Sequence, residues 1–387
     1  MSPVATNLLI ILFWAASGSV IYTYLLYPAL LFALSKLLGR TPTPPHPTTL
    51  PKASLLIVAH NEAAILDARI QNALATNYPA DLLEIIVASD GSDDETASIC
   101  ARYAPRIRPL LFPHRRGKPA TLEDAASRTT ADILILSDAN TFLDPDAARL
   151  LTRWFEDPTI AAVCGRLNLI DPATGRNADG LYWRYETFLK LHESRLGALL
   201  GANGAIYAIR RELLAPIPRG TIVDDFVIPL AAKLRTGSRL IYDPAAIAHE
   251  DSAPDLRAEF RRRVRISVGG WHSLLTLWPL LSPAHGFTAL ALWSHKVLRW
   301  TCPLALIAAV ASSLALSSRP LYAALTIAQL LFHTLCITAA LSPPAPTAAR
   351  VLRLAGMFFS MNLALLVGFA SWLRGNHTGA WQRTARS

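Results

Sequence analysis

Three short polar segments hold the side chains of this chain that are best suited to chemistry. They are His60-Asn61-Glu62, the aspartate-rich stretch 89–95 and Ser137-Asp138-Ala139-Asn140, and each follows a short apolar run. A single aspartate after such a run is usually only a turn or helix-capping residue. Three polar segments in the same position favour instead one shared site, built mainly from carboxylate oxygens.

The apolar runs predict the elements that position these segments. Short runs of aliphatic residues indicate strands, and helical spacing follows the first of them over residues 63–75. Strands that alternate with helices predict a parallel α/β sheet. Ligands of such sheets bind beyond the carboxyl ends of the strands, so we expect the three segments to lie close together. The predicted strands are 54–59, 83–88, 107–112 and 133–136.

The sequence lacks several motifs that would indicate other chemistries. It has no P-loop, no G-x-G-x-x-G after the first strand and no G-x-S-x-G elbow. Its four cysteines are far apart, and no histidines and cysteines stand at zinc-binding spacing. Aspartates with few thiol or imidazole partners suit a hard cation such as Mg²⁺ or Mn²⁺, which commonly bridges carboxylates to a diphosphate.

Taken in order along the chain, six motifs resemble those of the membrane-bound family 2 glycosyltransferases, the branch with cellulose, chitin and hyaluronan synthases. The resemblance implies an α/β domain of the GT-A fold, a Rossmann-like nucleotide-diphospho-sugar transferase, beside transmembrane helices. The matching segments are Asn61-Glu62, Asp90-Gly91-Ser92-Asp93-Asp94, Gly117-Lys118, the D-x-D-like Asp138-Ala139-Asn140, the acidic pair Asp224-Asp225, and Arg262-Arg263-Val264-Arg265-Ile266 at the place of Q-x-x-R-W.

The resemblance also implies a role for each matching residue. Asp225 would be the general base, which accepts the proton of the acceptor hydroxyl in one inverting displacement. Asp138 and Asn140 would bind the metal ion. The residues that would bind the nucleotide-sugar are His60, Glu62, Asp90, Lys118, Asp138, Arg263 and Arg265, and those on the acceptor side are Asn203, Gly204 and Asp224.

Simpler roles stay open for several of these residues. Asp224 and Asp225 could cap a helix that begins near Phe226, and Lys118 could be a solvated loop residue. The arginine cluster could bind lipid phosphates, alone or in addition to a diphosphate. The near-helical spacing of the aromatic residues from Trp183 onward favours a core position over a sugar-binding surface.

Two departures from the family pattern bear on function. Asn140 stands at the second aspartate of D-x-D, and a neutral amide oxygen is a weaker ligand for a hard cation than a carboxylate. Ile266 stands at the tryptophan that contacts the acceptor sugar in polymerising members. We therefore expect transfer of one or a few sugars rather than processive synthesis.

The distribution of charge along the 387 residues predicts membrane segments at both ends. The net charge is +9, yet all 28 acidic residues and only 22 of the 37 basic residues lie within 62–259. The ends are therefore basic and apolar while the centre is acidic, which argues against a nucleic-acid-binding domain. This pattern is typical of a soluble domain between membrane segments.

The apolar stretches set the predicted domain boundaries. We expect an N-terminal transmembrane helix at 7–35, a proline-rich linker at 36–52, the GT-A domain at 53–254, amphipathic interfacial helices at 255–299, about three transmembrane helices within 300–373 and a basic tail at 374–387. Basic residues follow the first span and none precedes it, which predicts a cytoplasmic catalytic domain. Three later spans would put the C-terminus outside, whereas the basic tail favours the cytoplasm.

Together these features predict a multi-pass inner-membrane glycosyltransferase of the hexosyltransferase type. With Mg²⁺ or Mn²⁺, it would move a sugar from a nucleotide-sugar donor to a lipid-linked or glycan acceptor in cell-surface or exopolysaccharide synthesis. Membrane lipids would be its other partners, and no nucleic acid. One alternative is a non-catalytic membrane scaffold or binding subunit with a degenerate transferase domain. Another is a nucleotidyltransferase, against which the missing phosphate loop argues.

Overall fold

Two compact units make up the part of the chain that the computed structural model describes, which is residues 1–46, 49–171, 180–252, 256–341 and 350–375. The first, here called the sheet unit, holds residues 33–254 and 272–291. The second, here called the helical unit, holds residues 1–32, 255–271 and 292–377.

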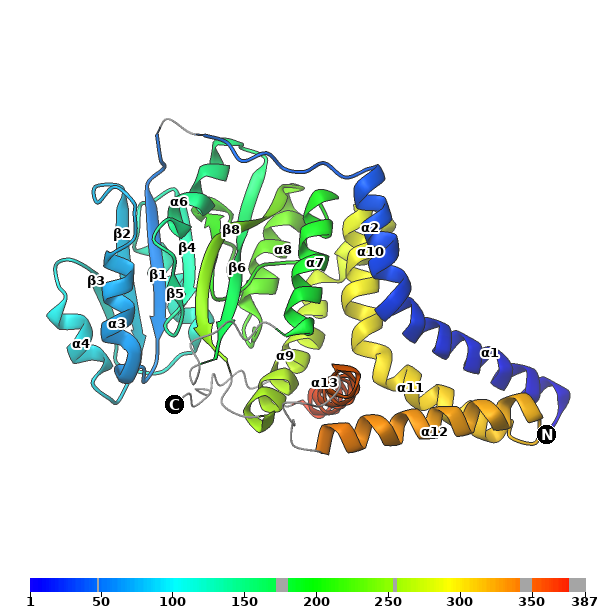
Figure 1. The fold of residues 1–387 in the computed structure, drawn as a ribbon. Helices are drawn as coiled ribbons and strands as arrows, with labels where there is room; N and C mark the ends of the chain where they lie inside the picture. Colours follow the sequence, from blue (N-terminus) through cyan, green and yellow to red (C-terminus); the bar gives the residue numbers. More distant parts are fainter. Residues whose placement is uncertain (47–48, 172–179, 253–255, 342–349, 376–387) are drawn as a thin grey trace. The chain divides into compact units, whose positions relative to one another are not determined.

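A mixed eight-stranded sheet is the centre of the sheet unit (Figure 1). Its strands are β1 (Ala53–Ala59), β2 (Leu83–Asp90), β3 (Arg108–Phe112), β4 (Ile133–Asp138), β5 (Phe142–Leu143), β6 (Ile160–Ile170), β7 (Tyr207–Arg210) and β8 (Arg239–Asp251). Their order in the sheet is β3-β2-β1-β4-β7-β6-β8-β5. The first four neighbours are parallel, whereas β7 and β5 run antiparallel to the strands beside them.

The four strands predicted from the sequence are confirmed as β1 to β4. In the parallel register, Val58 lies beside Asp138 and Ala59 lies beside Ser89. Two of the strands run past their predicted ends, so that Asp90 and Asp138 are the last residues of β2 and β4. The aspartates that follow apolar runs in the sequence therefore lie at the carboxyl edge of the sheet.

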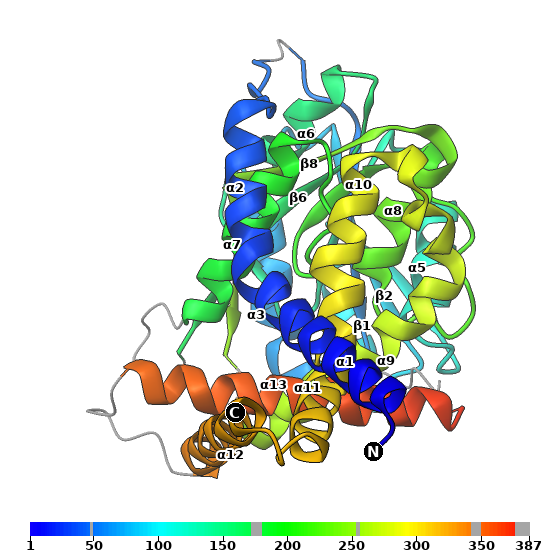
Figure 2. The same cartoon turned by 90° about the vertical axis from the view of Figure 1, so that its right-hand side faces the viewer.

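Helices cover both faces of this sheet. They are α3 (Ala63–Leu74), α4 (Thr96–Arg102), α5 (Lys118–Ser127), α6 (Ala147–Thr152), α7 (Leu181–Arg195) and α8 (Asp224–Thr236). On one face, Leu55 and Ile57 of β1 are fully buried with Leu66 and Ile70 of α3, and α4 and α6 join the same core. On the other face lie α5 and α8 (Figure 2). The sheet is thus a rigid layer whose carboxyl edge is available for a site.

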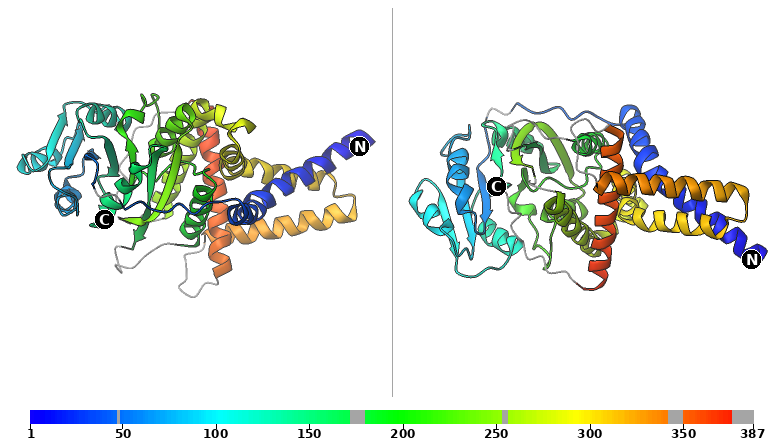
Figure 3. Two further views of the ribbon diagram at one scale, coloured as in Figure 1. Left: turned by 90° about the horizontal axis from the view of Figure 1, so that it is seen from above. Right: turned by 60° about the horizontal axis from the view of Figure 1, so that its bottom comes forward.

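Helices form most of the rest of the described chain. They are α1 (Pro3–Ile21), α2 (Tyr27–Leu37), α9 (Leu256–Leu277), α10 (Phe287–Ala291), α11 (Leu298–Ala315), α12 (Pro320–Leu341) and α13 (Arg350–Leu373), with π-helical turns between α1 and α2 and between α10 and α11. Figure 3 shows α1, α11 and α12 lying side by side, and α13 packs against α12. Phe13 of α1 meets Tyr322 of α12 edge to face, with ring centroids 5.4 Å apart.

Four helices in the described residues are long and apolar enough to cross a membrane: Pro3–Leu37, Phe287–Ala315, Pro320–Leu341 and Val351–Leu373. The first extends into the predicted linker, and the second begins at Phe287, within the segment expected to be interfacial. Between the sheet unit and that second helix, α9 is a single helix of 22 residues. Most of the predicted basic tail lies outside the described residues. The domain boundaries stay predictions.

Replacing Leu55 by alanine should lower the free energy of unfolding by about 2–5 kcal/mol, because the side chain is fully buried in the core of the sheet unit. The matched control is Leu111→Ala on β3, where the side chain is 48% exposed and the change should stay within about 0.5 kcal/mol. Denaturant unfolding of the detergent-purified chain measures both. Equal losses would contradict this account of the core.

Candidate active site

Asp90, at the end of β2, anchors the first part of the site. Its side chain is buried, and its carboxylate accepts three hydrogen bonds. Two come from the backbone N–H groups of Arg116 and Gly117, at 2.8 and 2.9 Å, and one from the Thr121 hydroxyl at 2.8 Å. A carboxylate has about four acceptor positions, so these bonds leave about one for a ligand. Asp90 thereby fixes the turn that leads into α5.

The turn after β1 lies beside Asp90. His60 donates a hydrogen bond from Nδ1 to the carbonyl oxygen of Asp90 at 2.8 Å. Asn61 has a φ of +56°, a left-handed conformation that asparagine tolerates better than most residues. Glu62 is buried, and its backbone N–H donates to the Thr96 hydroxyl at 2.9 Å. The structure therefore brings His60 to Asp90 and places Glu62 at the start of α3.

Lys118, the first residue of α5, joins two of the predicted site aspartates. Its Nζ lies 2.8 Å from Oδ1 of Asp138 and 3.2 Å from Oδ2 of Asp224, the first residue of α8. Burial alone lowers the pKa of the ammonium, but the carboxylates of Asp138 and Asp224 outweigh burial and raise this pKa above its ordinary value. Lys118 is therefore a charged, ion-paired residue rather than a solvated loop residue.

Asp225 lies next to these ion pairs and faces a glycine loop. Its Oδ2 accepts a hydrogen bond from the backbone N–H of Gly204 at 2.8 Å. A Cβ added at Gly204 would lie 3.4 Å from Oδ2 of Asp138 and 3.5 Å from Oδ2 of Asp225, so both carboxylates border the same bare stretch of backbone. The N-cap of α8 is Val223, so neither Asp224 nor Asp225 is the capping residue.

The crowding of negative charge sets the protonation of Asp225. Burial and the neighbouring carboxylate of Asp224 raise the pKa of Asp225 to about 6, against the opposing effect of the Lys118 and Lys190 ammonium groups. Burial, followed by the same two carboxylates, also raises the pKa of the Tyr207 hydroxyl on β7 well above its ordinary value. A carboxyl group with a pKa near 6 is ionised at neutral pH and still basic enough to accept a proton.

Arg69 of α3 holds the turn after β4 and was not selected from the sequence. Its side chain is fully buried and donates to the Ser137 hydroxyl and to the side-chain oxygen of Asn72, both at 3.0 Å. The Asn72 side chain in turn exchanges two hydrogen bonds of 2.9 Å with the backbone of Leu143. Helical spacing alone does not show that these polar residues face inward, so the sequence offered no signal for them.

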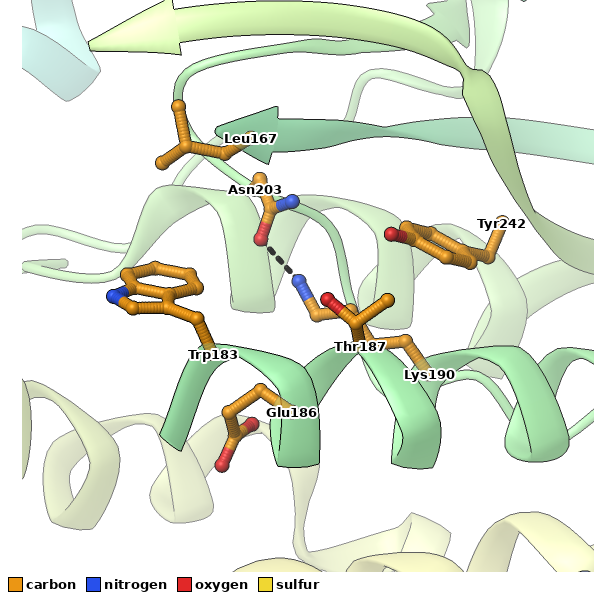
Figure 4. A pocket seen from close by; sticks show the side chains of 7 residues that line it. All are labelled: Leu167, Trp183, Glu186, Thr187, Lys190, Asn203 and Tyr242. Atoms are coloured by element: carbon orange, nitrogen blue, oxygen red, sulfur yellow. Dashed lines mark hydrogen bonds between the residues drawn. The ribbon is translucent and has the colours of Figure 1, made fainter. Parts of the chain in front are cut away.

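A small pocket lies beside Asn203, one of the residues predicted on the acceptor side. The Asn203 amide donates to the Gly165 carbonyl at 2.9 Å, and its side-chain oxygen accepts a hydrogen bond from the ammonium of Lys190. Figure 4 shows Lys190 and Trp183 projecting from α7 towards Asn203. Trp183 thus lines a pocket, contrary to the core position expected from its spacing. The lining residues are Leu167, Trp183, Glu186, Thr187, Lys190, Asn203 and Tyr242.

Asp138 and Asn140, the predicted metal ligands, both place side-chain oxygens at the end of β4. The Asn140 amide donates from Nδ2 to Oε1 of Glu250 on β8 at 2.8 Å. Among the described residues, no three His, Cys, Asp or Glu side chains are grouped to hold an ion by themselves. The donor set still fits Mg²⁺ or Mn²⁺, because Mg²⁺ in particular binds through one or two protein oxygens and completes its shell with phosphates and water.

Arg263 and Arg265 belong to α9 in the helical unit, whereas the other predicted site residues belong to the sheet unit. Arg263 pairs with Glu259, one helical turn earlier, at 2.7 Å, and Glu259 also pairs with Arg262 at 2.8 Å. A diphosphate or a lipid phosphate would have to compete with Glu259 for these arginines. The phosphate-binding role of Arg263 and Arg265 stays a prediction.

Residues 54–216 match the model of the family described as Glycosyl transferase family 2. The chain is 24% identical over 237 residues to a poly-beta-1,6-N-acetyl-D-glucosamine synthase of Staphylococcus aureus, covering 57% of this chain and 55% of that protein. It is also 24% identical over 271 residues to a beta-monoglucosyldiacylglycerol synthase of Synechocystis, covering 66% of this chain and 56% of that protein. The chain spans about half the length of these curated relatives.

A solved structure shares the fold. It is a mannosyltransferase from Pyrobaculum calidifontis in complex with GDP-Man and Mn²⁺, similar with a TM-score of 0.70 at 22% identity. The similarity covers 95% of this chain and 98% of that one. The prediction of a GT-A fold is thereby confirmed.

Removing the ammonium at Lys118, as in Lys118→Met, should destabilise the protein by about 3–5 kcal/mol at neutral or higher pH, because it leaves the buried carboxylate of Asp224 and the partly buried carboxylate of Asp138 unpaired. The loss should be smaller near about pH 5 than near about pH 8. Without Lys118 the pKa of Asp225 rises further above 6, and a carboxyl group with a raised pKa destabilises the folded state only once the pH is high enough to ionise it.

Thermal unfolding of the parent and the variant at both pH values measures this difference. Lys52→Met is the matched control, because Lys52 is exposed and its loss should leave stability nearly unchanged at either pH. A Lys118→Met variant that lost no more stability at the higher pH would contradict the ion-pair account.

Proposed function

We propose that this protein, whose residues 54–216 match the model of glycosyl transferase family 2, is a membrane-bound inverting hexosyltransferase. It moves a sugar from a nucleotide-diphosphate donor to a lipid-linked or glycan acceptor, in cell-surface or exopolysaccharide synthesis. The observation that carries this proposal is the half-buried Asp225 carboxyl group, with a pKa of about 6, beside the Lys118–Asp138 ion pair. Relatives named as synthases of a polysaccharide and of a glucosyldiacylglycerol support it.

The donor occupies the carboxyl edge of the parallel strands. Asp90 has about one acceptor position left after its three internal hydrogen bonds, and this position suits an N–H or O–H group of the nucleoside. His60 and Glu62 border the same end of the sheet. The diphosphate lies towards Lys118 and Asp138, where the ammonium of Lys118 offsets part of its negative charge.

Mg²⁺ or Mn²⁺ would be the metal cofactor of this reaction, and Asp138 and Asn140 would hold it. When bound, it supplies positive charge that stabilises the departing diphosphate. The Mn²⁺ in the Pyrobaculum mannosyltransferase structure supports a divalent ion in this role. Lys118 adds a fixed charge from the protein, since its own ion pairs with Asp138 and Asp224 already hold it at the site.

Asp225 acts as the base of a single displacement. The acceptor hydroxyl loses its proton to the Asp225 carboxylate as the acceptor oxygen forms a bond to the anomeric carbon. The bond from that carbon to the diphosphate oxygen breaks, and its electron pair leaves with the nucleoside diphosphate. The hydrogen bond from Gly204 holds one oxygen of Asp225, so the other oxygen is the one that meets the acceptor.

The acceptor binds on the α7 side of the site, beside this small pocket. Asn203 borders this pocket, and the next residue, Gly204, holds the base, so an acceptor bound there would reach Asp225. Trp183 offers an aromatic surface for a sugar ring, and Lys190 and Thr187 offer polar contacts. Because Ile266 replaces the tryptophan of the polymerising members, we propose transfer of one or a few sugars.

We propose that this chemistry takes place at the cytoplasmic face of the inner membrane. Four candidate spans indicate a membrane protein. The first span is followed by the basic residues Lys36, Arg40 and Lys52, which favours a cytoplasmic sheet unit. Nucleotide-sugars are made in the cytoplasm, so the donor would reach the site directly.

Asp225→Asn should reduce nucleoside diphosphate release by about 10²- to 10⁴-fold, because an amide cannot accept the acceptor proton. The assay uses detergent-purified protein with Mg²⁺ or Mn²⁺, a panel of nucleotide-sugars, and a membrane lipid extract added or omitted. Asp81→Asn, at an exposed position, is the matched control and should keep parental activity. Parental turnover by Asp225→Asn, or recovery of long polymer from one donor, would each overturn part of the proposal.

The pH profile of turnover should rise through about pH 6, since Asp225 works as a base only in its ionised form and its pKa lies near that value. Steady-state rates at saturating donor, measured from about pH 5 to about pH 8, test this. The Lys118→Met variant should shift the rise to higher pH, because Lys118 opposes the increase in the pKa of Asp225. A profile that is flat across this range would contradict the role of Asp225.

A further inference from the structure

Asn140 and Glu250 form a pair that the motif pattern does not contain. Asn140 stands where D-x-D has its second carboxylate, and its Nδ2 donates to Oε1 of Glu250 at 2.8 Å. The antiparallel pairing of β5 with β8, in which Phe142 lies opposite His249, brings the turn after β4 alongside the end of β8. A carboxylate distant in sequence thereby lies beside the position from which one is missing.

The chemistry of the two groups fixes how the amide is oriented. An ionised carboxylate only accepts hydrogen bonds, whereas an amide has a donor end and an acceptor end. Glu250 therefore holds the NH₂ end of Asn140, and the amide oxygen Oδ1 points away from Glu250. That oxygen is the only atom of the side chain that a hard cation binds.

The neighbouring residue His249 is engaged elsewhere. Its Nε2 lies 2.8 Å from Oδ1 of Asp144, and successive side chains of a strand point to opposite faces. Glu250, not His249, is thus the residue of this strand end that reaches Asn140.

We propose that Glu250 is a positioning residue for the divalent cation, an inference that rests on the proposed function. It orients the Asn140 amide with its oxygen towards the ion. Its carboxylate also supplies the negative charge that the second aspartate of D-x-D would carry, but from behind the hydrogen bond to Asn140. Partners that orient a metal ligand in this way typically change metal affinity about 10- to 100-fold when they are mutated. The Asn140–Glu250 pair then acts as one unit.

The reciprocal exchange of the pair provides the test. In Glu250→Gln, the new amide no longer dictates which end of Asn140 faces the ion, so Mn²⁺ affinity should fall about 10- to 100-fold. In the double variant Asn140→Asp with Glu250→Gln, a carboxylate at 140 accepts a hydrogen bond from an amide at 250. The pair then has the same total charge and one hydrogen bond, but the carboxylate stands at 140 and the amide donor at 250. The Mn²⁺ affinity should return close to the parental value.

Mn²⁺ binding is measured by the electron paramagnetic resonance signal of free Mn²⁺, on the full chain in detergent, with UDP and separately with GDP. Titrations of each nucleotide without protein give the background. Glu212→Gln, at an exposed glutamate, is the matched control and should bind as the parent does. Thermal unfolding of each variant shows whether the chain is folded.

The outcomes separate this inference from the proposed function. Parental affinity in Glu250→Gln would overturn the inference and leave the proposed function intact. A double variant that binds as weakly as folded Glu250→Gln would also overturn it, because Glu250 would then bind the ion directly. If the parent does not bind Mn²⁺ in the presence of UDP or in the presence of GDP, both the metal-assisted function and the inference are wrong. If Glu250→Gln does not fold, the affinity of the double variant alone decides.

Discussion

The attraction of one ammonium group for carboxylates that would otherwise repel each other holds the site together. Lys118 comes from the start of α5, Asp138 from the end of β4 and Asp224 from the start of α8, so its two ion pairs connect three elements distant in the sequence. Opposite charges attract more strongly where water is partly excluded. The same group also moderates the repulsion that raises the pKa of Asp225. The pKa of Asp225 and the stability of the site thus depend on the same set of charges.

The rest of the sheet unit supplies the rigidity that this charge cluster needs. Asp90 uses most of its hydrogen-bond acceptor positions on the turn and first residues of α5, and these bonds fix the position of Lys118. Arg69 donates a hydrogen bond to Ser137 from the opposite face of the sheet, and this bond fixes the position of the neighbouring Asp138. Because both supports are buried, the charged groups are held by the chain itself and need little reorganisation when a ligand binds.

The parallel half of the sheet could be predicted because its signals are local. Each of β1 to β4 is an apolar run that ends in turn-forming residues, and the polar segments follow directly. The strands β6, β7 and β8 gave no comparable signal, since β7 has only four residues and β6 pairs with residues far along the chain. Lys190, which contacts Asn203, was missed for the same reason. Whether a helix or strand residue faces a site depends on packing between distant segments.

The helix from Phe287 was expected to start later because Lys296 and Arg299 interrupt its apolar run, yet Arg299 is buried within the protein.

The order of the strands separates the segments assigned to the donor from the segments that border the pocket at α7. Within the sheet unit, the residues assigned to the donor come from one continuous stretch, from His60 to Asn140, which forms the parallel strands β1, β2 and β4. The residues that border the acceptor pocket come from β6, α7, β8 and the loop before β7. The two groups share little more than the ion pairs of Lys118 and the backbone of Gly204. On the proposed assignment, mutations in the second stretch would alter the choice of acceptor while the donor half keeps its structure, so the product would change without a change of sugar nucleotide.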